Sequence, residues 1–159
     1  MQHTSIPKRG RSRLSARQAG AKFERAIADY LSSHFDGPGE RTIDRQVKMG
    51  SKDLGDIRGV KTLSGGRVVV ECKEYGGKFQ VGPWLTEAET ERGNADAVAG
   101  VVIAKRRGVS DPAEQVAFMT VRDLVALIGL ERPDLHGVEH AAEVIQLPVG
   151  QDPFGGDAA

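Results

Sequence analysis

Residues Gly55–Lys73 read Gly-Asp-Ile-Arg-Gly-Val-Lys-Thr-Leu-Ser-Gly-Gly-Arg-Val-Val-Val-Glu-Cys-Lys, and this stretch decides the fold. The β-branched run Val68–Val70 follows a Gly-Gly turn, which predicts a strand that runs to Lys73 and pairs with a strand near Asp56. Side chains alternate between the two faces of a strand. One face is apolar and is expected to pack on a core: Val68, Val70 and Cys72. The other face carries Val69, Glu71 and Lys73.

The polar end of this strand predicts a site. The hairpin can bring Asp56 beside Glu71, with the amine of Lys73 next to both. Two carboxylates and a lysine at a sheet edge suit a hard divalent cation and a phosphate. In the alternative interpretation, Glu71 and Lys73 form a solvated charge pair and Asp56 is a turn residue. The strongly apolar strand and a third acid upstream, Glu24, favour the site.

The remaining pattern predicts an α/β protein. Apolar residues recur at helical spacing from Ser15 to Phe35 and place Glu24 at the border of the buried stripe. The other predicted elements are a strand at 42–49, a helix from Trp84 to about Arg92, strands at 97–104 and 116–119, and a helix capped by Thr120 that ends near Gly129. This order indicates a mixed β-sheet flanked by helices. Trp84 and the helix Val121–Leu130 are assigned either to the core or to a dimer interface.

Composition bounds the class of protein. A chain of 159 residues is expected to form one domain with a substantial core. It has no apolar run of membrane-spanning length, and no apolar segment follows its basic N-terminus. The single cysteine, Cys72, rules out an intramolecular disulfide. We therefore expect a cytoplasmic protein with no membrane association.

Charge divides the chain unevenly, although the net charge is zero. Residues 1–110 contain 20 Lys and Arg against 13 Asp and Glu, whereas residues 111–159 contain 2 against 9. We predict a flexible basic arm at 1–17, a folded domain at 18–130 and an acidic, disordered tail at 131–159. The arm carries Lys8, Arg9, Arg11, Arg13 and Arg17, which either contact DNA phosphates or stay free in solution. The tail is interpreted as an aid to solubility.

In combination, these motifs resemble the PD-(D/E)xK nuclease superfamily, and within it the archaeal-type Holliday junction resolvases. Such resolvases begin with a helix that carries Gly-x-x-x-Glu-Arg, matched here by residues 20–25. The match continues with a Ser-containing loop (Gly50-Ser51), then Asp56-Ile57, then a strand that ends Glu71-Cys72-Lys73. A helix and a buried strand followed by basic residues complete it, so that it covers residues 18–108. The chain departs from the pattern in two ways: Gly55 replaces the proline of the family name, and the net charge is neutral.

The resemblance implies a restriction-endonuclease-like core and phosphodiester hydrolysis assisted by Mg²⁺, with Mn²⁺ as a substitute. It implies metal ligation by Asp56, Glu71 and the backbone carbonyl of Cys72, with Glu24 bound directly or through water. Lys73 would orient the attacking water or stabilise the charged phosphorus centre. The implied catalytic set is thus Glu24, Asp56, Glu71 and Lys73. The implied DNA contacts are Arg25, Ser51, Lys105, Arg106 and Arg107.

These observations predict a Mg²⁺-dependent DNA endonuclease that resembles a Holliday junction resolvase and acts on branched or four-way DNA as a homodimer. One alternative is a restriction-like or single-strand-specific nuclease on the same fold. The other is a DNA-binding module that does not cleave, although the intact Asp56, Glu71 and Lys73 argue against it. His136-Gly-Val-Glu139-His140 has the spacing of a metalloprotease motif, but Pro133 and Gly137 disfavour the helix that such a motif needs.

Overall fold

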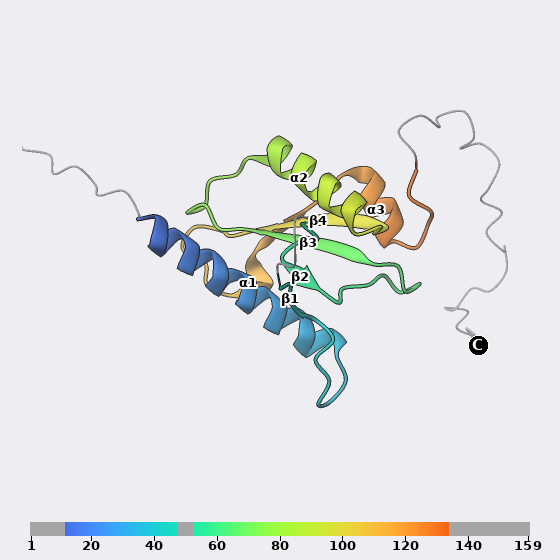
Figure 1. Cartoon of the computed structure of the whole chain (residues 1–159), viewed down its shortest axis with the longest axis horizontal. Helices are drawn as coiled ribbons and strands as arrows, with labels where there is room; N and C mark the ends of the chain where they lie inside the picture. The colour runs from blue at the N-terminus through green and yellow to red at the C-terminus, as the bar shows by residue number, and fades with distance from the viewer. Residues whose placement is uncertain (1–11, 48–52, 134–159) are drawn as a thin grey trace, which may run out of the picture.

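The computed structural model describes residues 12–47 and 53–133, which form an α/β fold with a five-stranded mixed sheet between helices (Figure 1). The sheet order is β1-β2-β3-β4-β5; β3 and β4 are parallel, and the other neighbours are antiparallel. The elements are α1 (Arg13–Phe35), β1 (Asp44–Arg45), β2 (Ile57–Arg58), β3 (Val68–Lys73), α2 (Val81–Asn94), β4 (Ala99–Ala104), a 3-10 turn η1 (Pro112–Glu114), β5 (Val116–Phe118) and α3 (Val121–Leu127). The predicted order of elements and the mixed, helix-flanked sheet are confirmed.

Element boundaries differ from the prediction at two places near the N-terminus. The helix α1 begins at Arg13, because the hydroxyl of Ser12 accepts a hydrogen bond from the Ser15 backbone N–H at 3.2 Å. Arg13 and Arg17, which we grouped with the basic arm, therefore lie in α1. Residues 1–11 of the arm and residues 134–159 of the tail, including the His136–His140 motif, lie outside the described residues.

The strand predicted at 42–49 is much shorter than expected. Only Asp44 and Arg45 pair with β2. The backbone N–H groups of Thr42 and Ile43 instead donate to the carboxylate of Asp36, which follows α1. These bonds hold the chain against the end of the helix rather than in the sheet. Residues 48–52, including Ser51, lie outside the described residues.

Both faces of β3 are buried. Val68 and Val70 pack with Phe23 and Ile27 of α1, in a cluster that α3 joins through Ala126. On the opposite face of the sheet, α2 packs Trp84 and Ala88 against Val102 and Ala104 of β4. Trp84 is thus a core residue. The alternation predicted for β3 is confirmed.

Helix α2 also buries the polar end of β3. Glu71 is 7% exposed and Lys73 is 6% exposed. A solvated charge pair is therefore excluded, because both side chains lie under a helix.

In the part of the chain that the structure describes, no helix has the length and apolar character needed to cross a bilayer.

Gly55 is required by the backbone, and a substitution there tests the packing of the hairpin. Its φ is +88°, and a Cβ would lie 2.9 Å from a methyl group of Val69 and 3.1 Å from the Val70 carbonyl oxygen. A proline, whose φ is near −65°, cannot take this conformation. We expect Gly55→Ala to lower the free energy of unfolding by about 1–2 kcal/mol for the backbone and by about 1–3 kcal/mol more for the overpacking.

Gly65→Ala is the matched control for this prediction. Gly65 has the same φ of +88°, but a Cβ there meets no atom within 4 Å. It is therefore expected to cost only the backbone contribution. Urea unfolding of both variants measures the difference, and equal losses would show that the contact with Val69 relaxes freely.

Candidate functional site

One cleft of about 590 Å³ brings the predicted catalytic side chains together. Glu24 enters it from α1, Asp56 from the residue before β2, and Glu71 and Lys73 from β3. Cys72, Gly20 and Tyr75 also line it. We call this hollow the acid cleft. Residues that are far apart in the sequence meet there because α1 and the β2–β3 hairpin pack around the same end of β3.

Asp56 is fixed beside β3 by backbone bonds on both sides. Its N–H donates to the Val70 carbonyl at 2.9 Å, and its own carbonyl accepts from the Gln46 N–H at 2.7 Å. Its side-chain Oδ2 accepts a hydrogen bond from the Cys72 N–H at 3.0 Å. This bond orients the Asp56 carboxylate along the strand that carries Glu71. Cys72, predicted as a ligand through its carbonyl, thus also positions a carboxylate through its amide.

Lys73 lies between two carboxylates. Its Nζ is 2.6 Å from Oε1 of Glu71 and 2.7 Å from Oε2 of Glu87, a residue of α2. Burial opposes the charged form of Lys73, but hydrogen bonds to Glu71 and Glu87 outweigh this and raise its pKa. The amine is therefore a fixed cation in the cleft wall.

Two acids from α2 join this group and were not predicted. Carboxylate oxygens of Glu71, Glu87 and Glu91 all lie within 4.8 Å of one another. Glu91 is 3% exposed, and its Oε2 has no hydrogen-bond partner among the described residues. Burial, followed by the charges of Asp56 and Glu91, raises the pKa of Glu71 to about 9, and burial raises that of Glu91 to about 7. Three clustered carboxylates, of which Lys73 contacts only Glu71 and Glu87, favour either protonation or the uptake of a cation.

A signal for Glu91 was present in the sequence. Trp84, Ala88 and Glu91 stand at spacings of four and three residues, so they share one face of α2. All three are buried. An acid on the buried stripe of a helix is costly unless it serves a site, and such a position could have marked Glu91. Glu87 lies at the edge of the same face and its side chain is 48% exposed.

Glu24 has a partner that the sequence did not indicate. The guanidinium of Arg45 in β1 donates to Oε2 of Glu24 from Nε at 2.9 Å and from Nη2 at 2.5 Å. This pair ties α1 to the edge strand and holds Glu24 at the rim of the acid cleft. A role for Glu24 in metal binding would therefore involve its other oxygen or a bridging water.

Three of the residues predicted to contact DNA bond to other groups of the protein. Arg25 is paired with Asp44 at 2.5 Å. Lys105 donates to the Val109 carbonyl at 2.9 Å, and Arg106 donates to the carbonyl of Glu114 at 2.9 Å. None of Lys105, Arg106 and Arg107 lines the acid cleft, although the Lys105 N–H bonds to the Lys73 carbonyl and keeps β4 beside β3.

A second hollow, of about 730 Å³, adjoins the acid cleft and shares Glu24 and Asp56 with it. It is lined by three acids, Glu24, Asp44 and Asp56, and by four arginines: Arg17, Arg25, Arg45 and Arg58. We call it the arginine hollow. Sequence reasoning missed Arg45 and Arg58, because they stand on strands of two residues that are too short for a pattern to mark their faces.

Comparison with known proteins gives no match: no family model, no curated protein and no solved structure matches this chain. The function of the acid cleft must be inferred from its residues. Asp56 and Glu71 offer the oxygen ligands that Mg²⁺ prefers. Lys73 adds a fixed positive charge, and the arginines beside the cleft can receive phosphates.

Proposed function

We propose that this protein is a metal-dependent DNA endonuclease of the PD-(D/E)xK type. The convergence of Asp56, Glu71 and Lys73 on one cleft carries the proposal. Structural ion pairs alone account poorly for this group. The ammonium of Lys73 contacts Glu71 and Glu87, and a third carboxylate, that of Glu91, lies within 4.8 Å of theirs. A divalent cation would neutralise the excess negative charge that burial makes costly.

The order of elements supports a restriction-endonuclease-like core. The resemblance requires a helix with Glu, strands that bring an Asp beside Glu-x-Lys, a further helix and a buried strand. Here α1 carries Glu24, β3 ends in Glu71-Cys72-Lys73, and α2 leads to the buried β4. The position of the family's proline is occupied by Gly55, whose positive φ produces the turn before Asp56 in another way.

In this proposal the side chains of the acid cleft have two roles, metal ligation and electrostatic stabilisation. Asp56 and Glu71 would hold Mg²⁺, or Mn²⁺ in its place, and the Cys72 carbonyl and Glu24 would be further oxygen donors. A bound cation would supply Lewis acidity, which lowers the pKa of bound water and offsets negative charge on the phosphate. Lys73 orients the attacking water or stabilises the charge that develops on the phosphorus centre, at no cost of reorganisation because its two partners already fix it.

The proposed substrate is DNA, in particular branched or four-way DNA cleaved by a homodimer. The arginine hollow beside the acid cleft offers cations to phosphates on either side of the cut. A four-way junction has two-fold symmetry, so a dimer with two such clefts matches it. Exposed apolar side chains on and after α3 could contact a second copy: Val121, Leu124, Ile128 and Leu130.

We expect the purified protein to cleave DNA with Mg²⁺ and to lose this activity with EDTA. Four-way junctions, flapped DNA and linear duplex, each labelled on one strand, measure the preference. Paired symmetric nicks in the four-way junction are expected, together with a dimer in sedimentation. Equal nicking of linear and branched DNA would leave a nuclease but contradict the resolvase proposal. DNA binding without any cleavage would indicate a non-catalytic module.

A further inference from the structure

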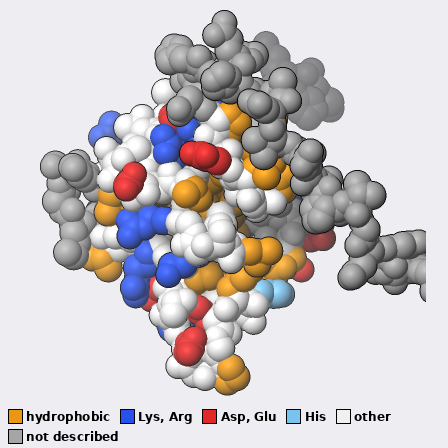
Figure 2. All heavy atoms as spheres, turned by 90° about the vertical axis from the view of Figure 1, so that its right-hand side faces the viewer, with side chains coloured by type: hydrophobic (Ala, Val, Ile, Leu, Met, Phe, Trp, Pro, Cys, Tyr) orange, Lys and Arg blue, Asp and Glu red, His pale blue; other side chains and the backbone are white. Residues whose placement is uncertain are grey.

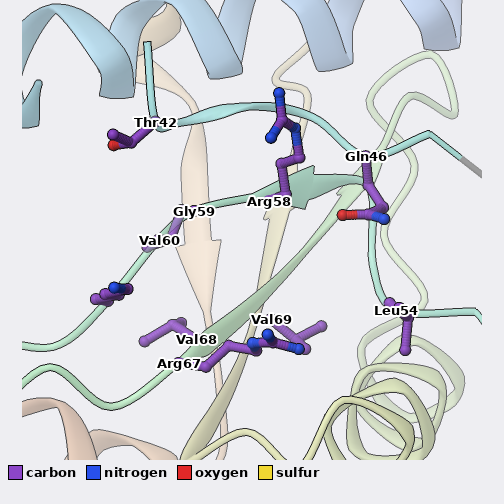
Figure 3. A pocket seen from close by; sticks show the side chains of 10 residues that line it. Thr42, Gln46, Leu54, Arg58, Gly59, Val60, Arg67, Val68 and Val69 are labelled. Atoms are coloured by element: carbon purple, nitrogen blue, oxygen red, sulfur yellow. The ribbon is translucent and has the colours of Figure 1, made fainter. Parts of the chain in front are cut away.

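A third hollow lies beside β2 and the start of β3, whereas the acid cleft is lined by the other end of β3. Its volume is about 340 Å³. Figure 3 shows Arg58 and Gln46 on one side of it, and Arg67 with Val68 and Val69 on the other. We call it the basic pocket. Its lining includes the cations of Arg58, Lys61 and Arg67, and no Asp or Glu is among its described lining residues.

Within residues 12–47 and 53–133, the arginines of the basic pocket have few partners. The Arg67 side chain donates one bond there, from Nη1 to the Ala95 carbonyl at 3.2 Å. The nearest ion pair of Arg58 is to Asp44 at 3.9 Å, which is too long for a good hydrogen bond. Val68 and Val69 of β3 also line the pocket and are almost fully buried. The pocket thus presents positive charge beside the buried start of a strand.

The three hollows form one path across the molecule. The basic pocket shares Gln46 and Arg58 with the arginine hollow, and the arginine hollow shares Glu24 and Asp56 with the acid cleft. Arg58 lies where the arginine hollow meets the basic pocket, and Lys61 and Arg67 line the basic pocket beyond it. Lys and Arg side chains also gather into a group on the face of the molecule shown in Figure 2. A strand whose phosphate sits at Asp56 and Glu71 can therefore continue over Arg58 toward Lys61 and Arg67.

We propose that the basic pocket binds a backbone phosphate of the DNA, away from the phosphate that is cut. This inference rests on the proposed function and extends it, because it names a contact that sets the position of the strand. Guanidinium groups match the geometry of phosphate oxygens, and a site without acids repels no phosphate. Since the pocket does not touch the acids of the cleft, it contributes to affinity and register rather than to the chemical step.

The test removes the two cations that line only this pocket. Lys61→Ala/Arg67→Ala is compared with Lys78→Ala/Arg122→Ala, which removes the same charges from positions that line none of the three hollows. Binding of a fluorescein-labelled DNA duplex is followed by anisotropy at several salt concentrations without divalent metal. The slope of log affinity against log salt is expected to become shallower by about 0.9 for the pocket variant, and the affinity to fall about tenfold at 0.1 M salt. The control should keep the wild-type slope.

Turnover separates this role from a catalytic one. At saturating DNA, the pocket variant is expected to cleave at the wild-type rate, while KM rises about tenfold. Lys61→Glu, an exposed substitution that leaves the Arg67 bond in place, is expected to weaken binding as well. Wild-type slopes in both variants, with normal cleavage by the wild-type protein, would overturn the pocket and leave the nuclease. A wild-type protein that binds no DNA would overturn both.

Discussion

Asp56→Asn and Glu71→Gln are each expected to reduce Mg²⁺-dependent DNA cleavage by about 10³-fold or more. Each change removes a formal negative charge from a proposed metal ligand and keeps the shape of the side chain. The cation contributes several kcal/mol to stabilising the transition state, so a weakened site loses most of the rate. Gel assays with labelled DNA measure the cleavage, and calorimetric titration with Mg²⁺ and with Mn²⁺ measures the metal affinity.

Folding is expected to survive both changes. The amide oxygen of Asn can still accept the Cys72 N–H bond that Asp56 receives. Glu71 is buried and its pKa is raised to about 9, so a neutral Gln resembles the form favoured at neutral pH without metal. Glu114→Gln, at an exposed acid paired with Arg106, is the matched control and should cleave normally. Near-wild-type cleavage by either cleft variant would contradict the metal site.

The sequence predicted the centre of the site because β3 has a regular period. A strand fixes which side chains share a face, so Glu71 and Lys73 could be placed together from the alternation alone. The hairpin length then brought Asp56 to the same end. The position of Glu24 followed from the stripe of α1, since a border residue of a packed helix reaches over the sheet.

What the sequence did not predict depends on contacts between elements. Glu87 and Glu91 lie close to Glu71 because of the way α2 is rotated on the sheet. The sequence of α2 does not fix this rotation, because the helix contains several small side chains. Arg25 and Arg106 were predicted as DNA contacts, but each has an acid within 3.3 Å that lies on another element or loop. A basic residue carries no local mark that distinguishes a structural ion pair from a phosphate contact. Among the described residues, some arginines are paired with acids, whereas the side chain of Arg67 makes a single bond, to a backbone carbonyl.

Lys73→Ala is expected to slow DNA cleavage by about 10²–10³-fold while DNA affinity changes little. The loss is that of one preorganised electrostatic partner, and a single phosphate contact is a small part of the affinity. The fixed position of Nζ between Glu71 and Glu87 explains the preorganisation. Single-turnover rates at saturating DNA measure the chemical step, and anisotropy measures binding.

A purely structural role for Lys73 makes a different prediction. Lys73 lowers the pKa of Glu71, so without it the carboxyl of Glu71 would hold its proton more tightly. A structural role would then appear as lower Mg²⁺ affinity that excess Mg²⁺ restores, with cleavage recovering at saturation. Glu87→Gln, which removes only the half-exposed partner of Lys73, is the matched control and should keep most of the rate. A cleavage rate that stays low for Lys73→Ala at saturating Mg²⁺ would support direct action of Lys73 on the phosphate. Weaker DNA binding with normal turnover would show instead that Lys73 only holds the substrate.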